Sequence, residues 1–133
     1  MTVSVEEVFD KAPFIQLLGY VLEDWGEGWV ETSLRLAPKH LQQHGYVHAG
    51  VLTTMADHTS GGAASTLIPE GHSILTAQLT MHLLRPARGE ALRCRAEVVK
   101  PGRTLIVTEA DVYCDDDHVG RFLATMASIP RPL

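Results

Sequence analysis

Cysteine, aromatic residues and long apolar runs are all scarce in this sequence, and each scarcity argues against a class of protein. The chain has 133 residues, of which two are cysteine and 6% are aromatic. Cys94 and Cys114 stand far apart and match no CxxC pattern, so we expect small buried thiols instead of a zinc or redox site. No apolar run is long enough to cross a bilayer.

A basic block, the usual mark of a nucleic-acid-binding protein, is also missing. Lys and Arg number 11 against 16 Asp and Glu, which gives a formal net charge of −5. This balance argues against nucleic acid as a partner. The acidic run Asp115–Asp117 predicts a solvated hairpin turn, because Asp favours turns, and not a cation site.

Residues 1–7 are acidic and lack the basic and apolar parts of a signal peptide, so we expect a cytoplasmic protein with no membrane association. Hydrophobic residues make up 45% of the chain and charged residues 20%. That composition and length suffice for one domain with a core. No repeat, linker or low-complexity segment interrupts the sequence, and we predict a single domain over 1–133.

Helix signals appear at the N-terminus and again near the middle of the chain. Ser4 is a typical N-cap for a short amphipathic helix over residues 4–11, and Pro13 ends it. Residues 14–18 predict a further helical turn. The one long helix is expected over 49–66, after a loop, and its many small residues suit close packing against a sheet.

Strand signals lie on both sides of that long helix. Residues 20–25 and 28–36 predict a hairpin around Gly26-Glu27-Gly28, because apolar and polar residues alternate in the second arm. Four strand-like runs follow the helix, over 73–85, 90–100, 104–114 and 119–129. Their spacing predicts an antiparallel meander, and the whole chain an α+β domain.

The most informative stretch is residues 42–57, where a loop rich in Gly and His leads into the long helix. A helix N-terminus offers free N–H groups and the positive end of a dipole. Asp57 is an acid two turns inside a helix that is otherwise apolar or small. One short segment therefore carries an anion-stabilising helix end and a base or nucleophile, the two parts that acyl transfer needs.

The spacing of these residues resembles that of a known family. Gln42, Gly45, His48-Ala49-Gly50 and Asp57 follow the motif of the hotdog-fold acyl-CoA thioesterases of the PaaI and 4-hydroxybenzoyl-CoA thioesterase type. Thr76-Ala77-Gln78-Leu79, closing with Leu84-Arg85-Pro86-Ala87, is similar to the first long strand after the helix in that family. The resemblance covers roughly residues 15–129 and implies a curved antiparallel sheet wrapped around one long helix.

The resemblance also implies a site and a reaction, the hydrolysis of an acyl- or aryl-CoA to the free acid and coenzyme A. Asp57 would activate a water or attack the thioester carbonyl directly. Ala49 stands where the family usually has Gly and would donate its backbone N–H to the thioester oxygen. The remaining candidates are Gln42, His48 and Thr76 around the reaction centre, and Gly50, Arg85 and Arg103 for binding substrate.

The family further implies a homodimer, often paired into a homotetramer, with each site shared between two chains. The helix acid would come from one chain, and the loop Gln and oxyanion donor from the other. No metal or redox cofactor is expected. His44, His48 and His58 lie near Asp57 in the sequence, but they match no HExxH pattern.

Two rival functions stay open at this point. Hotdog dehydratases act on 3-hydroxyacyl thioesters and usually carry a Gly-Val-Leu-x-x-Glu pattern, which would place an acid at position 55. This chain has Met55 there, which argues against a dehydratase. A hotdog protein that binds acyl thioesters without catalysis is the other rival, because Ala49 departs from the family pattern.

Overall fold

The computed structural model describes residues 4–131, so the first three and last two residues of the predicted domain lie outside it. The chain forms two short N-terminal helices, a long central helix and six strands. The helices are α1 (Val5–Asp10), α2 (Pro13–Leu18) and α3 (Ala49–Ser65), and a 3₁₀ turn covers Pro38–His40. The Ser4 hydroxyl accepts the N–H of Glu7, so the predicted cap of α1 is confirmed. No helix among the described residues is both long and apolar enough to span a membrane.

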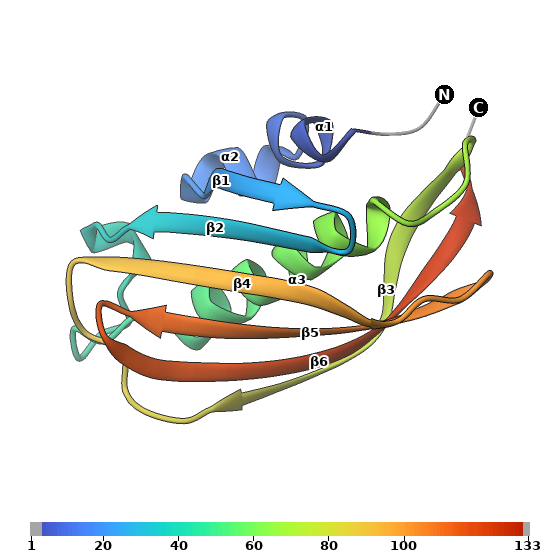
Figure 1. Ribbon diagram of the computed structural model, residues 1–133. Coiled ribbons are helices and arrows are strands. Elements are labelled where there is room, and N and C mark those ends of the chain that lie inside the picture. Colours follow the sequence, from blue (N-terminus) through green and yellow to red (C-terminus); the bar gives the residue numbers. More distant parts are fainter. Residues whose placement is uncertain (1–3, 132–133) are drawn as a thin grey trace.

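The six strands build one antiparallel sheet in front of α3, as Figure 1 shows. They are β1 (Val21–Gly26), β2 (Trp29–Arg35), β3 (His72–Leu83), β4 (Ala91–Lys100), β5 (Leu105–Cys114) and β6 (Asp117–Pro130). The predicted strands and the Gly26–Gly28 hairpin are confirmed to within a few residues. The fold is the expected α+β hotdog, a curved sheet around one long helix.

The predicted meander is wrong at one strand. The order in the sheet is β1-β2-β4-β5-β6-β3, so β3 pairs with β6 at the far edge and not with its successor β4. The hairpin strand β2 takes the free edge of β4. The chain therefore crosses the sheet between β3 and β4, and both β1 and β3 are edge strands.

Small residues let α3 approach the sheet closely. Ala56, Ala63 and Ala64 are fully buried. A Cβ added to Gly62 would meet Phe9 of α1 at 3.2 Å and Val30 of β2 at 3.4 Å. Larger side chains on this side of α3 would push the helix and sheet apart, because interiors pack to crystal-like density.

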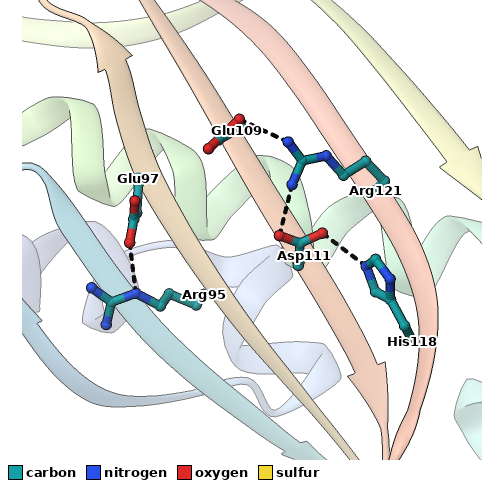
Figure 2. Close-up of polar contacts among 6 residues, drawn as sticks. All are labelled: Arg95, Glu97, Glu109, Asp111, His118 and Arg121. Carbon is teal, nitrogen blue, oxygen red and sulfur yellow. Dashed lines mark hydrogen bonds and ion pairs between the residues drawn. The ribbon is translucent and has the colours of Figure 1, made fainter.

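The outer face of the sheet, away from α3, carries paired charges. Arg121 contacts both Asp111 (2.8 Å) and Glu109 (2.9 Å), and Arg95 contacts Glu97 (2.9 Å), as drawn in Figure 2. His118 also contacts Asp111, at 2.8 Å. Exposed pairs of this kind contribute about 0–1 kcal/mol each. Their main effect is to keep this face polar and paired.

Both cysteines are free and buried, as expected. Burial raises the pKa of the Cys94 thiol to about 12. The thiol is therefore protonated at neutral pH and is not a nucleophile, because reactivity belongs to the thiolate.

The edge strand β3 contains a β-bulge at Ala77. Thr76 pairs with Met126, while Gln78 pairs with the adjacent Thr125, so Ala77 is the extra residue. Side chains alternate between the two faces of a strand, and an extra residue shifts the alternation by one. Thr76 therefore faces α3 before the bulge, and Leu79 does so after it.

Helix α1 packs against α3 through His58. The His58 Nε2–H donates a hydrogen bond to the carbonyl oxygen of Val8 at 2.7 Å, and the Phe9 ring meets the imidazole edge-on with the ring centroids 4.8 Å apart. Burial is the main cause of a His58 pKa below its ordinary value. The neutral imidazole is therefore the form that holds α1 in place.

This packing predicts a loss of stability in acid. Below a pH of about 6.5 the unfolded state binds a proton at His58 more readily than the folded state does, so the free energy of unfolding falls with pH. We expect His58→Gln to lose less stability between pH 7 and pH 5 than the wild type in urea unfolding. His44→Gln, in an exposed loop, is the control. Equal losses in wild type and His58→Gln would contradict the prediction.

Candidate active site

Asp57 and Thr76 meet on the side of α3 that faces β3. The Thr76 hydroxyl donates a hydrogen bond to Oδ1 of Asp57 at 2.7 Å, and it also lies 3.3 Å from the sulfur of Met126. The fold thus brings together two residues that the sequence predicts as site residues and that lie 19 positions apart in the chain. The bond fixes one carboxylate oxygen and leaves the other for a reactant.

A cavity of about 270 Å³ opens beside this pair, and we call it the Asp57 cavity. Its walls come from α3, the start of β3 and helix α1. The lining includes Val8, Asp57, His58, Gly61, Ser65 and Thr76. A carboxylate in the lining of a largely apolar hollow is the usual arrangement for a catalytic base or nucleophile.

The loop before α3 is held in shape by His40 and Gln42. His40 is buried; its Nε2 bonds the Leu18 carbonyl at 2.7 Å and its Nδ1 accepts the N–H of Ala37 at 3.0 Å. The Gln42 side-chain oxygen accepts the N–H groups of His44 and Tyr46. Among the described residues its amide nitrogen donates no hydrogen bond.

Gly45 is needed where this loop turns. Its φ of +87° lies in the left-handed region, and an added Cβ would meet the Arg88 guanidinium at 3.0 Å. Glycine adopts such a conformation without strain, whereas other residues do not.

His48 is the N-cap of α3. Its Nδ1 accepts the N–H of Gly50 at 2.8 Å, so that N–H is used inside the protein. The N–H of Ala49, the first residue of the helix, has no hydrogen-bond partner within residues 4–131. Of the N–H groups at positions 49 and 50, therefore, Ala49's is the one available to a bound anion.

Ala49 lines a second cavity, also of about 270 Å³, between the N-terminal end of α3 and the segment that follows β3. We call it the Ala49 cavity. Arg85 belongs to its lining and donates to the His118 carbonyl at 2.8 Å. Arg103 is different, because it lies in the exposed turn between β4 and β5 and lines neither cavity. The structure thus joins Arg85 with Ala49 and leaves Arg103 apart.

The three histidines near Asp57 in sequence are not brought together. His48 caps α3, His58 bonds the Val8 carbonyl, and His44 is exposed in the loop. Within the described range, no three or more His, Cys, Asp and Glu side chains are grouped to hold a metal.

Sequence reasoning missed three contributors to this region, which are Gly61, Ser65 and His40. Gly61 and Ser65 line the Asp57 cavity because they follow Asp57 by one and two helical turns. That spacing of four residues was a readable signal. The buried His40 gave none, since its partners Ala37 and Leu18 are fixed only by the folded loop.

Asp57 and Ala49 are too far apart in one chain to act on one carbonyl group. Eight residues separate them along α3, which corresponds to about 12 Å at the rise of an α-helix. Hydrogen bonds and nucleophilic attack both need about 3 Å. The acid and the free N–H therefore belong to separate halves of any site that uses both.

Comparison with known proteins identifies the family. The model of the thioesterase superfamily matches residues 44–121. A thioesterase family protein from Silicibacter pomeroyi is 35% identical, with 96% of each chain covered and a TM-score of 0.91. A hypothetical thioesterase from Streptococcus pneumoniae, solved with coenzyme A, is 25% identical over 86% of this chain and 92% of its own, with a TM-score of 0.76.

The likeness in fold extends to PaaI. The Escherichia coli PaaI protein, from a phenylacetic acid degradation operon, is 20% identical over 95% of this chain and 91% of its own, with a TM-score of 0.85. That similarity concerns the fold. The matched segment contains the cap of α3, Asp57 and Thr76, the residues that form the geometry described above. This chain belongs to the thioesterase superfamily.

Proposed function

We propose that this protein hydrolyses the thioester of an acyl- or aryl-coenzyme A, releasing the free acid and coenzyme A. The superfamily supports thioester hydrolysis in general, and the Streptococcus pneumoniae relative that was solved with coenzyme A supports this carrier. The observation that carries the proposal is the Asp57–Thr76 hydrogen bond in the lining of a cavity.

Asp57 starts the reaction in this proposal. Its carboxylate takes a proton from a water that attacks the thioester carbonyl, and the C–S bond then breaks to release coenzyme A as the thiolate, which takes up a proton. Alternatively the carboxylate attacks that carbon itself, the same C–S bond breaks to leave an anhydride, and water then cleaves the anhydride to the free acid and the Asp57 carboxylate. Thr76 orients the carboxylate through its 2.7 Å hydrogen bond. In either route the carbonyl oxygen gains negative charge. A hydrogen-bond donor must stabilise that charge from the side of the carbonyl group away from Asp57.

The Ala49 N–H is that donor. A backbone N–H at a helix start faces the positive end of the helix dipole and needs no particular side chain, so Ala serves as well as Gly. His48 assists by capping Gly50, which leaves Ala49 as the exposed donor. The amide nitrogen of Gln42 is free to hold the substrate or the water.

The separation of about 12 Å between Asp57 and Ala49 leads us to propose a site shared by two chains. Two-fold symmetry places residue i of one chain against residue j of the other, twice. The β3 edge suits such a pairing: Leu79 and Leu83 lie on its helix-facing side, yet they are 39% and 52% exposed. We therefore propose a homodimer joined at β3, open to further pairing as a tetramer, and keep the cytoplasm as its expected location.

Coenzyme A phosphates are the proposed partners of Arg85. Guanidinium groups bind phosphate through paired, charge-assisted hydrogen bonds. Arg85 lines the Ala49 cavity and therefore stands near the proposed thioester carbonyl. Arg103, in a turn apart from both cavities, would reach only a distant part of the carrier.

Replacement of Asp57 should abolish turnover without unfolding the chain. We expect Asp57→Asn to lower kcat by about 10²–10⁴-fold on a good acyl-CoA substrate, because the base is lost while the side-chain shape is kept. Thiol release is followed with a trapping dye, and circular dichroism checks the fold. Asp116→Asn, in the exposed β5–β6 turn, is the control and should keep wild-type turnover. Near wild-type kcat in Asp57→Asn would refute the assignment.

Ala49→Pro tests the donor separately. Proline has no N–H but is favoured at the first position of a helix, and His48 already has the extended backbone that precedes proline. We expect kcat to fall about 10²–10³-fold, the usual cost of one oxyanion donor. Ala49→Gly, which keeps the N–H, should retain most activity. If Ala49→Pro is folded and fully active, another group must bind the oxyanion.

Mixing these two inactive variants tests the shared site. A dimer of one Asp57→Asn chain and one Ala49→Pro chain has one doubly damaged site and one intact site. Random pairing of equal amounts makes about half of the dimers mixed, so about a quarter of all sites should recover. Pull-down with a tag on one variant verifies subunit exchange. Exchange without recovered thiol release would exclude a site built from Asp57 of one chain and Ala49 of the other.

A further inference from the structure

The Asp57 cavity extends along helix α3. On α3 it is lined by Asp57, Gly61 and Ser65, one helical turn apart, and on β3 by Thr76 and Ser73. The segment of α3 from Asp57 to Ser65, which lines the cavity, is about 12 Å long. The cavity therefore starts at the proposed reacting carbonyl and runs toward the C-terminal end of α3, away from the Ala49 end of the same helix.

Helix α1 forms one wall of this cavity through Val8. The wall is fixed, because the Val8 carbonyl accepts the 2.7 Å hydrogen bond from His58 and Phe9 packs edge-on against the same imidazole. Trp25 of β1 also donates to Glu6 of α1, at 3.3 Å. The size of the cavity thus depends on where the N-terminal helix is held.

Two adjacent glycines of α3 have different surroundings. A Cβ added to Gly62 would meet Phe9 at 3.2 Å, whereas one added to Gly61 would meet nothing within 4 Å. Gly62 is explained by close packing. Close packing does not explain Gly61. In a helix interior, glycine lowers stability by about 1 kcal/mol relative to alanine. Because Gly61 lines the cavity, the missing side chain leaves space inside it.

The walls favour an uncharged occupant. Ile68 and Ile74 supply apolar surface, and Ser65 and Ser73 supply hydroxyl groups; the Ser65 hydroxyl already donates to the Gly62 carbonyl at 2.7 Å. None of the described residues that line the cavity is Lys or Arg, and burial lowers the pKa of the His58 imidazole in its wall, which already bonds the Val8 carbonyl. A second carboxylate on the substrate would enter without a cation to pair with and would face Asp57, which is costly in an apolar site.

We propose that the Asp57 cavity receives the acyl group of the thioester, and that Gly61 and Val8 set the largest group it accepts. The substrate class is then an uncharged aryl group or an aliphatic chain of medium length, and not a dicarboxylic or long-chain acyl group. This inference rests on the proposed function, because it places the reacting carbonyl at Asp57.

The test is a panel of acetyl-, hexanoyl-, benzoyl-, palmitoyl- and succinyl-CoA, assayed by thiol release. For the wild type we expect hexanoyl- or benzoyl-CoA to give the highest kcat/KM, with succinyl-CoA more than about 10-fold lower. The ratio of kcat/KM for hexanoyl-CoA to that for acetyl-CoA should fall stepwise from wild type to Gly61→Ala to Gly61→Leu, by about 10–100-fold in the last, since pocket methylenes are worth about 10–200-fold each.

The wall formed by α1 is tested with Val8→Ala, which should raise the kcat/KM for the longer acyl groups relative to hexanoyl-CoA. Val5→Ala is the matched control, because Val5 is buried on the same helix but does not line the cavity. A shift in acyl preference with Val8→Ala but not with Val5→Ala supports the proposal. Equal shifts in both, or a preference that no Gly61 or Val8 variant alters, would overturn it.

Binding separates this inference from the proposed function. If the wild type hydrolyses none of the panel, the thioesterase proposal fails, and the cavity is tested by equilibrium binding of hexanoyl-CoA against coenzyme A alone. Tighter binding of hexanoyl-CoA that is lost in Gly61→Leu and kept in Val5→Ala supports an acyl cavity. No difference between the two ligands, or the same difference in Gly61→Leu, overturns it.

Discussion

The close approach of α3 to the curved sheet is the constraint on which the rest of the structure depends. Ala56, Gly62, Ala63 and Ala64 bring the helix against the strands, close enough for Thr59 of α3 and Thr32 of β2 to share a buried 2.8 Å hydrogen bond. The candidate site groups of α3 lie in its first turn and on the side facing β3. A helix held this tightly also fixes Asp57 relative to β3, which the catalytic role proposed for it would require.

The local part of this arrangement could be read from the sequence. Alternation predicts the strands, Ser4 predicts the cap of α1, and the Gly45–His48–Asp57 spacing predicts a loop followed by a helix with an acid inside. The position of β3 could not be read. Strand pairing is decided by long-range competition for edges, and periodicity says only that a segment is a strand, not which neighbour it takes.

The candidate site shows the same division. Asp57 and Thr76 come from elements that sequence patterns predict, but their contact depends on β3 lying at the far edge of the sheet. Gln42 and His48 were readable as site candidates, whereas the hydrogen bonds that the Gln42 side chain accepts within the loop were not, because these depend on the turn at Gly45. Residue types indicate which chemistry is available. The hydrogen-bond partner of each polar atom is fixed only when the chain folds.

The single extra residue at Ala77 bears on how this gene can change. Thr76 before the bulge and Leu79 after it face α3 only because the bulge shifts the alternation between them. An in-frame deletion of Ala77 would leave Thr76 and Leu79 two positions apart, so regular alternation would keep both on the helix-facing side without a bulge. Most surface strands tolerate point substitutions and lengthening at their ends. In β3, by contrast, loss of one residue after the bulge, such as Thr80, would turn Met81 and Leu83 away from α3, whichever side chains those positions carry.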